Sequence, residues 1–366
     1  MIDTICLLIP KSEMMFLSGV SSWELYSKTD HYQKFVRNPT KAEKDTGKYF
    51  PRLTGYKRKF SQEANVRIEF SVPKLLYHNN LEELEDKDFS KVVDELQDRL
   101  KRMGVILTKN VIKTASVSSV HFSKNIELKN GYTSSYLISE MNKVDLRKSF
   151  DFAKTRFINN GQSLYAHATS HQMVIYDKIA DLKKGQKRAI DKTQTPYQRS
   201  LFTEFEKENK NKEILRFEIR LARKQKMNKV ISDLGFEKNP SFQDVFSSDM
   251  SQKVVYEYWK KIILHRSTGL FSLELSVKEI LQVMFLTDPK LKPRKAIYLL
   301  GLFVLARDAQ GMTQLRAMVT QRVHDRTWYR MKDELDYASE LITKNNLRDW
   351  VKEIDEELKN YKPYKK

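Results

Sequence analysis

Two stretches of the chain carry charged residues at every second position, which is the spacing of side chains on one face of a β-strand. In 214–222 these residues are Arg216, Glu218 and Arg220, and 65–71 carries Glu69 in the same way. Because successive strand side chains point to opposite faces, the charged groups share one face and the apolar residues between them share the other. Carboxylates beside cations can bind a divalent metal and a phosphodiester together. The spacing therefore favours metal-assisted chemistry on phosphate.

Two further alternating stretches add other reactive groups to this polar face. His121 lies in 117–123, and 172–178 carries Tyr176 and Lys178. An imidazole can join carboxylates in holding Mg²⁺ or Mn²⁺, a tyrosine can attack phosphorus, and lysine can stabilise the developing charge. An ordinary solvated sheet face with weak surface ion pairs would show part of the same pattern.

The elements that must position these residues are predicted from hydrophobic periodicity. The first half reads as strands with few helices, and its apolar sheet face is expected to lie under a helix at 81–103 that ends at Gly104. A further helix is expected at 140–155, and Asn159-Asn160-Gly161 predicts a hairpin. The remaining expectations are strands at 4–10, 65–71, 105–124, 172–178 and 214–222, a charged excursion at 179–213, and helices at 296–309, 313–323 and 325–340.

The pattern changes to helices only after about residue 236, a loop at 237–243 marks the change, and the domain boundary is expected near 236–241. The expected fold class is α+β, with an N-terminal antiparallel-sheet nuclease domain followed by an all-helical, helix-turn-helix-like domain. The expected domain limits are 1–238 and 239–366.

Composition excludes several classes of protein. The chain has 366 residues, a formal net charge of +19 and 40% hydrophobic residues, which predicts a folded core and a polyanionic partner. One cysteine, Cys6, excludes a disulfide scaffold and a cysteine-based zinc site. No apolar stretch approaches the ~20 residues of a membrane span, no secretion signal is evident, and no phosphate-binding glycine loop predicts ATP hydrolysis. A cytoplasmic protein without a membrane partner is expected.

The C-terminal helices contain a second group of candidate residues. A short connection leads into 325–340, where Asp325 can cap the helix. This arrangement is typical of a helix-turn-helix with 325–340 as the recognition helix, although a plain helical hairpin with a solvated basic face would look similar. The candidate DNA-binding residues there are Arg322, Arg326, Thr327, Arg330 and Lys332. His167 and His171 flank a second tight turn, predicted at 168–170, and are read as DNA contacts, since four-residue spacing makes a metal pair only on a helix.

The order of the motifs resembles a known family. R-I-E-F at 67–70 with P-K-L at 73–75 comes first, I-Y-D-K at 175–178 follows, and L-R-F-E-I-R-L stands at 215–221. This order and spacing resembles the gene II replication initiators of filamentous phages and, more distantly, the Rep-trans initiators of rolling-circle plasmids. The opening Met1-Ile2-Asp3 and the C-terminal helices extend the resemblance over most of the chain.

The resemblance implies a site-specific, single-strand DNA endonuclease that starts rolling-circle replication. It implies that Tyr176 is the nucleophile, that a 5′-phosphotyrosine and a free 3′-OH are formed, and that Glu218 and Glu69 hold Mg²⁺ or Mn²⁺. The chain departs from the family at Ser119, where the phage initiators have aspartate, so His121 either takes the ligand role or the metal site is weakened. Arg216, Arg220 and Lys178 are expected at the DNA phosphates.

The implied partners are single-stranded origin DNA and its duplex flank, with a host helicase and polymerase, and no small-molecule substrate. Two alternatives stay open. One is a non-catalytic, sequence-specific DNA-binding regulator on a degenerate initiator scaffold, and the other is an RNA-binding protein that uses the basic sheet face.

Overall fold

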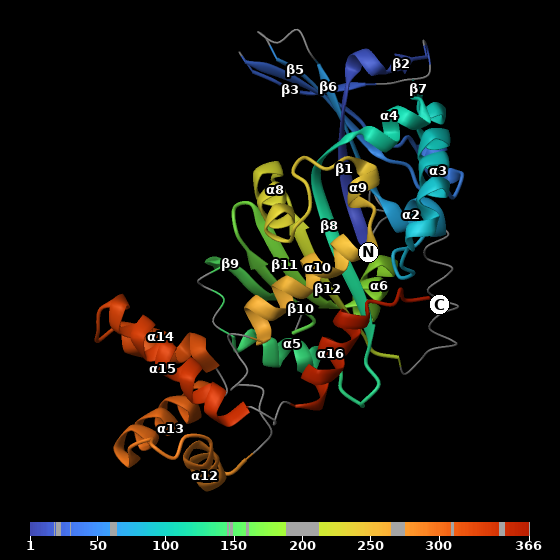
Figure 1. Cartoon of the computed structure of the whole chain (residues 1–366). Helices are drawn as coiled ribbons and strands as arrows, with labels where there is room; N and C mark the ends of the chain where they lie inside the picture. Colours follow the sequence, from blue (N-terminus) through green and yellow to red (C-terminus); the bar gives the residue numbers. More distant parts are fainter. Residues whose placement is uncertain are drawn as a thin grey trace. The chain divides into compact units, whose positions relative to one another are not determined.

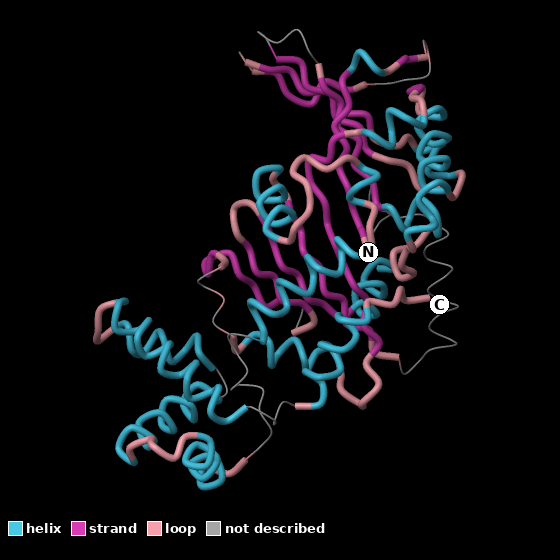
Figure 2. Tube along the Cα trace, in the orientation of Figure 1, coloured by secondary structure: helices cyan, strands magenta, loops and turns pink. Residues whose placement is uncertain are grey.

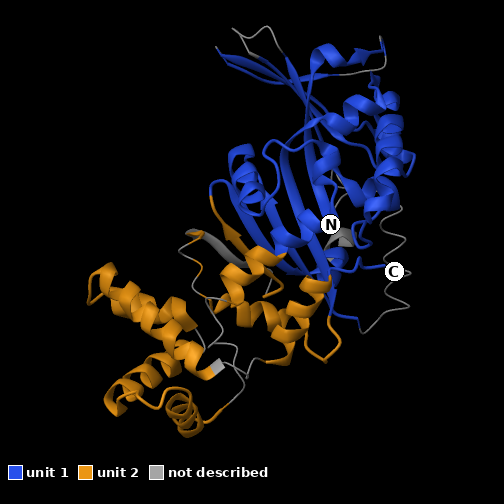
Figure 3. Ribbon diagram, viewed as in Figure 1, with its two compact units in different colours: residues 1–127, 169–255, 361–366 blue, residues 128–168, 256–360 orange. Residues whose placement is uncertain are grey.

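A computed structural model gives the fold of the chain. It describes residues 1–17, 19, 23–29, 31–58, 64–144, 146, 149–158, 161–187, 212–264, 275–308, 311–343 and 348–365. The chain forms two compact units (Figure 3): one comprises 1–127, 169–255 and 361–366, and the other 128–168 and 256–360. This division differs from the expected limits of 1–238 and 239–366, because a segment in the first half belongs to the second unit and the last residues return to the first.

An antiparallel sheet forms the centre of the first unit (Figures 1 and 2). Its strands lie in the order β3-β4-β5-β6-β1-β8-β12-β11, and every neighbouring pair is antiparallel. The α+β class with a large antiparallel sheet is thus confirmed. The strands are β1 (Ile2–Pro10), β3 (Glu24–Lys28), β4 (Tyr32–Arg37), β5 (Arg52–Arg58), β6 (Asn65–Ser71), β8 (Ser116–Glu127), β11 (His171–Asp177) and β12 (Ile214–Leu221).

One face of this sheet is the apolar core that the alternation predicts. Apolar side chains at every second position of β6, β1, β8, β12 and β11 are buried, and Leu7, Ile68, Phe122, Phe217 and Ile175 are at most 1% exposed. Removing such a side chain from water is worth about 1.5–3 kcal/mol, so the alternation fixes which face of each strand is buried.

The remaining elements of the first unit are mostly short helices. β2 (Met15–Phe16) pairs with β7 (Val105–Ile106) in a separate two-stranded sheet. The helical elements are η1 (Lys11–Glu13), α1 (Lys41–Asp45), α2 (Val72–Tyr77), η2 (Asp86–Asp88), α3 (Phe89–Arg102), α4 (Lys109–Thr114), α6 (Lys178–Lys187), α8 (Lys224–Asp233), α9 (Phe242–Val245) and α10 (Ser248–Trp259), whose last residues belong to the second unit.

The helix predicted at 81–103 is α3, which begins at Phe89 after one 3₁₀ turn and is followed by Gly104 at φ 82°. It reaches the sheet through α9. The Phe89 ring lies 5.2 Å from that of Phe242, which in turn lies 5.9 Å from the ring of Phe70 on β6. The aromatic rings of Phe89, Phe242 and Phe70 therefore connect α3, through α9, to the apolar face of the sheet.

Two local predictions are wrong. The strand expected at 105–124 is interrupted by α4, because the Thr108 side chain accepts a hydrogen bond from the Val111 N–H and starts a helical turn there. The helix expected at 140–155 ends early: α5 occupies Ser134–Asn142, capped by Thr133, and β9 begins at Asp151. In both cases a threonine cap set the helix start that apolar spacing alone did not show.

The second unit combines a hairpin with helices. β9 (Asp151–Ile158) pairs antiparallel with β10 (Ser163–His167), which confirms the predicted hairpin; Gly161 has φ 81°, and Asn159 and Asn160 lie outside the described residues. The helices are α5, η3 (Lys260–Leu264), α12 (Val277–Thr287), α13 (Pro293–Arg307), α14 (Gly311–Thr320), α15 (Asp325–Thr343) and α16 (Asp349–Asn360).

The three helices predicted near the C-terminus correspond to α13, α14 and α15, with residue 309 outside the described chain. Of the charged excursion expected at 179–213, residues 188–211 lie outside the described part and α6 occupies its beginning. Within the described residues, no helix has both the length and the apolar character needed to span a bilayer.

Candidate metal and phosphate site

The polar face of the sheet brings the predicted groups together by strand register. His121 on β8 lies opposite Arg220 on β12 and opposite Thr4 on β1, and Arg216 on β12 lies opposite Tyr176 on β11. Side chains that are directly opposite in a sheet share a face. The register therefore gathers the polar faces of β8, β12 and β11 into one surface, as the alternation predicts, and places β1 next to it.

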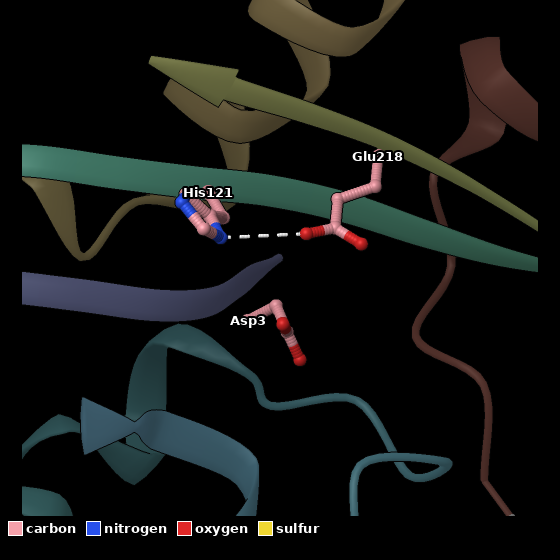
Figure 4. A group of neighbouring side chains, drawn as sticks. All are labelled: Asp3, His121 and Glu218. Atoms are coloured by element: carbon pink, nitrogen blue, oxygen red, sulfur yellow. Dashed lines mark ion pairs between the residues drawn. The ribbon is translucent and has the colours of Figure 1, made fainter. Parts of the chain in front are cut away.

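Three side chains on this surface form a cluster of possible metal ligands (Figure 4). One ligand atom each from Asp3, His121 and Glu218 lies within 4.8 Å of the other two, and Nδ1 of His121 is 3.4 Å from Oε1 of Glu218. Glu218 is 2% exposed and Asp3 is 9% exposed, whereas His121 stays partly accessible. We call Asp3, His121 and Glu218 the ligand triad.

Asp3 is the member of the triad that the sequence analysis did not find. Plain alternation along β1 puts position 3 on the same face as Ile5 and Leu7, which are core residues. The pairing of β1 with β8 instead shifts between Ile2 and Thr4. A β-bulge of this kind inserts one residue and turns its side chain away from the regular face. The bulge explains how Asp3 reaches the polar face.

Two arginines neutralise the carboxylates of the triad. Nη2 of Arg216 is 2.7 Å from Oδ1 of Asp3, and Nε of Arg220 is 2.8 Å from Oε1 of Glu218. Burial would raise the pKa of Glu218, but Arg220, and then His121 and Arg216, outweigh that effect and hold the pKa well below its usual value. The Glu218 carboxylate is therefore ionised at neutral pH.

A cavity of about 440 Å³ opens beside the triad. Arg52, Lys74 and Arg220 line it together with the triad and Glu69, so cations and carboxylates share its wall. The carboxylates can hold a divalent cation, and the three cationic side chains can hold an anion that binds to it. A phosphodiester is such an anion.

The triad fits Mg²⁺ or Mn²⁺ by its donors. Carboxylate oxygens and an imidazole nitrogen are ligands that these ions accept, and two carboxylates balance the charge of a divalent cation. Ligands on opposite sides of Mg²⁺ lie about 4.2 Å apart, twice the metal–oxygen distance. The three ligand atoms of the triad lie within 4.8 Å of one another, so none of their separations exceeds the distance between opposite ligands by more than about 0.6 Å. Arg220 would have to release one oxygen of Glu218.

Tyr176 lies on the same face but is buried. Its side chain is 9% exposed, and burial raises the pKa of its phenol well above the usual value although Arg216 opposes the shift. Lys178 is 0% exposed and begins α6, with its Nζ 5.7 Å from the centre of the Tyr176 ring. Lys178 therefore does not face solvent at the end of the strand. Burial, and then Arg216, lowers the pKa of this amine to about 7.

The other predicted ligand and the two hairpin histidines are placed differently. Glu69 is exposed and lines the cavity, but the ligand triad does not include it. His171 is 8% exposed, with its pKa lowered to about 4 by burial and by Lys226, so it is not a surface contact for DNA. His167 belongs to the second unit, where its ring stacks on that of Tyr165.

The candidate recognition helix is α15. Arg322, Arg326, Thr327 and Arg330 are exposed, as a DNA-reading surface requires. Lys332 is only 8% exposed, so its place on that surface was predicted wrongly. The helix is capped one residue earlier than expected, because Nδ1 of His324 accepts a hydrogen bond from the Arg326 N–H and Asp325 is already helical.

No family model matches the chain, and a match is found neither among curated proteins nor among solved structures. The function is therefore argued from the geometry of the polar sheet face.

Proposed function

We propose that this protein is a divalent-metal-dependent DNA-nicking enzyme of the rolling-circle initiator type, with its active site on the polar face of the first unit. The observation that carries the proposal is the ligand triad of Asp3, His121 and Glu218, which lies beside a cavity lined in part by cations and on the same sheet face as Tyr176. The net charge of +19 supports a nucleic acid as the substrate.

In this proposal each residue has a defined task. A cation held by the triad would polarise a phosphodiester and neutralise developing charge. Arg52, Lys74 and Arg220 hold the phosphate, and the Tyr176 oxygen attacks phosphorus. A bond from Tyr176 to the 5′-phosphate forms while the bond to the 3′-oxygen breaks, and the released 3′-oxygen takes a proton from water to give a free 3′-OH. Lys178, with a pKa of about 7, is uncharged in part at neutral pH and can accept the phenol proton.

The experiment is a search for the covalent adduct. Wild-type protein is mixed with labelled single-stranded oligonucleotides that cover candidate origins, with Mn²⁺ or with a chelator, and adducts are resolved on a denaturing gel. The proposal expects an adduct that requires the metal and disappears in Tyr176→Phe. Tyr165→Phe is the matched control, because Tyr165 is the next candidate nucleophile. An adduct that persists in Tyr176→Phe would show that another residue attacks.

A second candidate function is non-catalytic binding of DNA. It is favoured by the ion pairs of Arg216 with Asp3 and of Arg220 with Glu218, because these satisfy the carboxylates without any metal. Metal titration separates the two candidates: a nicking enzyme binds Mn²⁺ through the triad, whereas a pure binding protein shows DNA affinity that is unchanged by Mn²⁺ and forms no adduct.

For the second unit, we place selection of the DNA sequence on α15. Its exposed residues Arg326 and Arg330 are one helical turn apart and so can reach the same groove. This assignment goes with either candidate function.

A further inference from the structure

A pocket at the other end of the first unit is lined by aromatic rings. It has a volume of about 500 Å³ and lies among β2, β4, β5, β6 and the residues just before β3, at the end of the sheet drawn in dark blue in Figure 1. This volume is within the range of ligand pockets, ~300–1,000 Å³. Its aromatic side chains are those of Phe16, Trp23 and Phe35; Tyr56 also borders the pocket, but it follows Gly55 on β5, so its ring points to the opposite face of the sheet.

The floor of the pocket is a row across three strands. Phe35 on β4 lies opposite Gly55 on β5, and Gly55 lies opposite Val66 on β6. A Cβ atom added at Gly55 would be 3.6 Å from the Trp23 ring, which is an ordinary van der Waals contact, so position 55 lies directly beside the indole. A side chain that extends beyond Cβ at this position would occupy space next to the ring.

Polar groups and cations surround these rings. Gln33 and Lys57 form the next cross-strand row, and Asn65 and Lys11 complete the lining. The Phe16 ring stands edge-on to Trp23, with centroids 6.2 Å apart, and Nζ of Lys11 is 5.8 Å from the Phe16 centroid. Flat apolar walls beside the side-chain amide of Gln33 suit a planar heterocycle with hydrogen-bonding edges. Exposed lysines beside them suit the phosphates that flank such a ring.

We infer that this pocket is a stacking site for a base of single-stranded DNA, with Trp23 as the ring on which the base stacks. Base–aromatic stacking together with a basic track is how proteins hold single strands without reading their sequence. The inference rests on the proposed function for the identity of the nucleic acid. It adds a site that is separate from the ligand triad and that needs no metal.

Tryptophan fluorescence tests the inference directly. Of the four tryptophans in the chain, Trp259, Trp328 and Trp350 are at most 1% exposed, whereas Trp23 is partly exposed. A short oligothymidylate, titrated in the presence of a chelator, is expected to quench the emission. An abasic strand of the same length and charge is expected to bind more weakly and to leave the emission unchanged.

Variants separate stacking from general electrostatic attraction. Trp23→Ala is expected to weaken oligothymidylate binding about 5- to 150-fold, the range for one stacking aromatic, and to leave abasic binding unchanged. Trp23→Phe should retain affinity but lose the quenching. Gly55→Val keeps every ring and fills the floor, so it should lower affinity in a protein whose circular dichroism and melting temperature are unaltered. Tyr26→Ala is the control, because Tyr26 lies on β3 and is 66% exposed.

The outcomes are distinct from those of the adduct assay. Equal affinity for the thymidylate and abasic strands, or quenching that persists in Trp23→Phe, would overturn the stacking site. Tighter binding of oligouridylate than of oligothymidylate would overturn the assignment to DNA. If the proposed nicking fails while the stacking site holds, wild-type protein shows the quenching but no adduct. If only the stacking site fails, Trp23→Ala forms the Mn²⁺-dependent adduct at the same DNA concentration as wild type.

Discussion

Glu218 is surrounded by three cationic or basic groups, with Arg220, His121 and Arg216 all within 4.0 Å of its carboxylate. A buried charge that loses its partner is costly, so these groups act as one unit at the scale of single residues. If Glu218 binds an added divalent cation in preference to its arginine partners, this group of residues is a metal site. If Glu218 keeps its arginine partners, the group is an ion-pair network.

The first prediction gives opposite signs for two neighbouring substitutions. Glu218→Gln removes a ligand charge and should weaken Mn²⁺ binding about tenfold or more, whereas Arg220→Gln frees a carboxylate oxygen and should strengthen it. Electron paramagnetic resonance of free Mn²⁺ measures both. Glu69→Gln is the matched control and should change affinity by less than a few fold, since Glu69 lies outside the triad. If both Glu218→Gln and Arg220→Gln leave Mn²⁺ affinity unaltered, the triad is an ion-pair network.

The second prediction concerns the buried amine of Lys178, whose pKa is about 7 in the folded chain against 10.5 for the ordinary side chain. Between these values the unfolded chain binds the extra proton, so the free energy of unfolding should rise with pH from about 7 towards 10. For one group the slope is at most about 1.4 kcal/mol per pH unit. Urea unfolding between pH 7 and 9.5 measures the rise. In Lys178→Met the curve should be flatter, and an unchanged slope in this variant would assign the pH dependence to other groups.

The residues of the polar face could largely be predicted from sequence, because period-two alternation fixes the face of Glu218, His121 and Tyr176 once the strands are known. Asp3 could not. The face on which the Asp3 side chain lies depends on a β-bulge, and no residue type near position 3 predicts one. The burial of Lys178 could not be predicted for a related reason: the chain turns into α6 at this residue, and an alternation argument assumes that the strand continues.

At the scale of elements, strands were predicted better than helix limits. β6 matches its predicted limits, and β11 and β12 match within one residue, since each is a clean alternating run between polar segments. The helix at 140–155 failed because α5 starts earlier, at a Thr133 cap, and the chain has returned to strand by Asp151. The division into units was also beyond sequence reasoning, because it depends on where 128–168 packs.

The third prediction belongs to α15. Arg326→Ala combined with Arg330→Ala should weaken binding to the preferred duplex sequence more than binding to random DNA, because base contacts specify sequence while phosphate contacts only position the protein. The control is Lys290→Ala with Arg294→Ala, which removes two exposed charges from the same unit. Competition binding at fixed salt measures both double variants. An equal loss for every sequence would place the α15 arginines on phosphates.

At the scale of the whole molecule, the two ends of the chain meet inside the first unit. The Met1 amine donates hydrogen bonds to the Ser123 carbonyl and to the Tyr361 hydroxyl, and that hydroxyl donates to the same carbonyl. The Ser251 hydroxyl lies 2.6 Å from the Tyr361 oxygen. A tail that returns from the second unit thus closes the start of β1, the strand that carries Asp3.

The fourth prediction tests this closure. Tyr361→Phe removes a buried hydroxyl that several groups share, so it should lower the free energy of unfolding by about 1–3 kcal/mol. Tyr337→Phe is the matched control, because its hydroxyl donates to Asp288 at the surface and its loss should cost less than about 0.5 kcal/mol. Urea denaturation of both variants provides the comparison. Equal losses would mean that the meeting of the two ends contributes little.

The buried amine of Met1 also decides how this protein should be purified. An affinity tag fused ahead of Met1 turns the amine into an amide and forces extra chain into a space that is closed by Tyr361 and Ser123. Asp3 is two residues away, so the tag would disturb the ligand triad as well as the fold. Lys365 near the other end is exposed and accepts an extension without such a cost. An N-terminal tag would therefore disturb metal binding for reasons unrelated to the native site, so a C-terminal tag is the appropriate choice for assays of this chain.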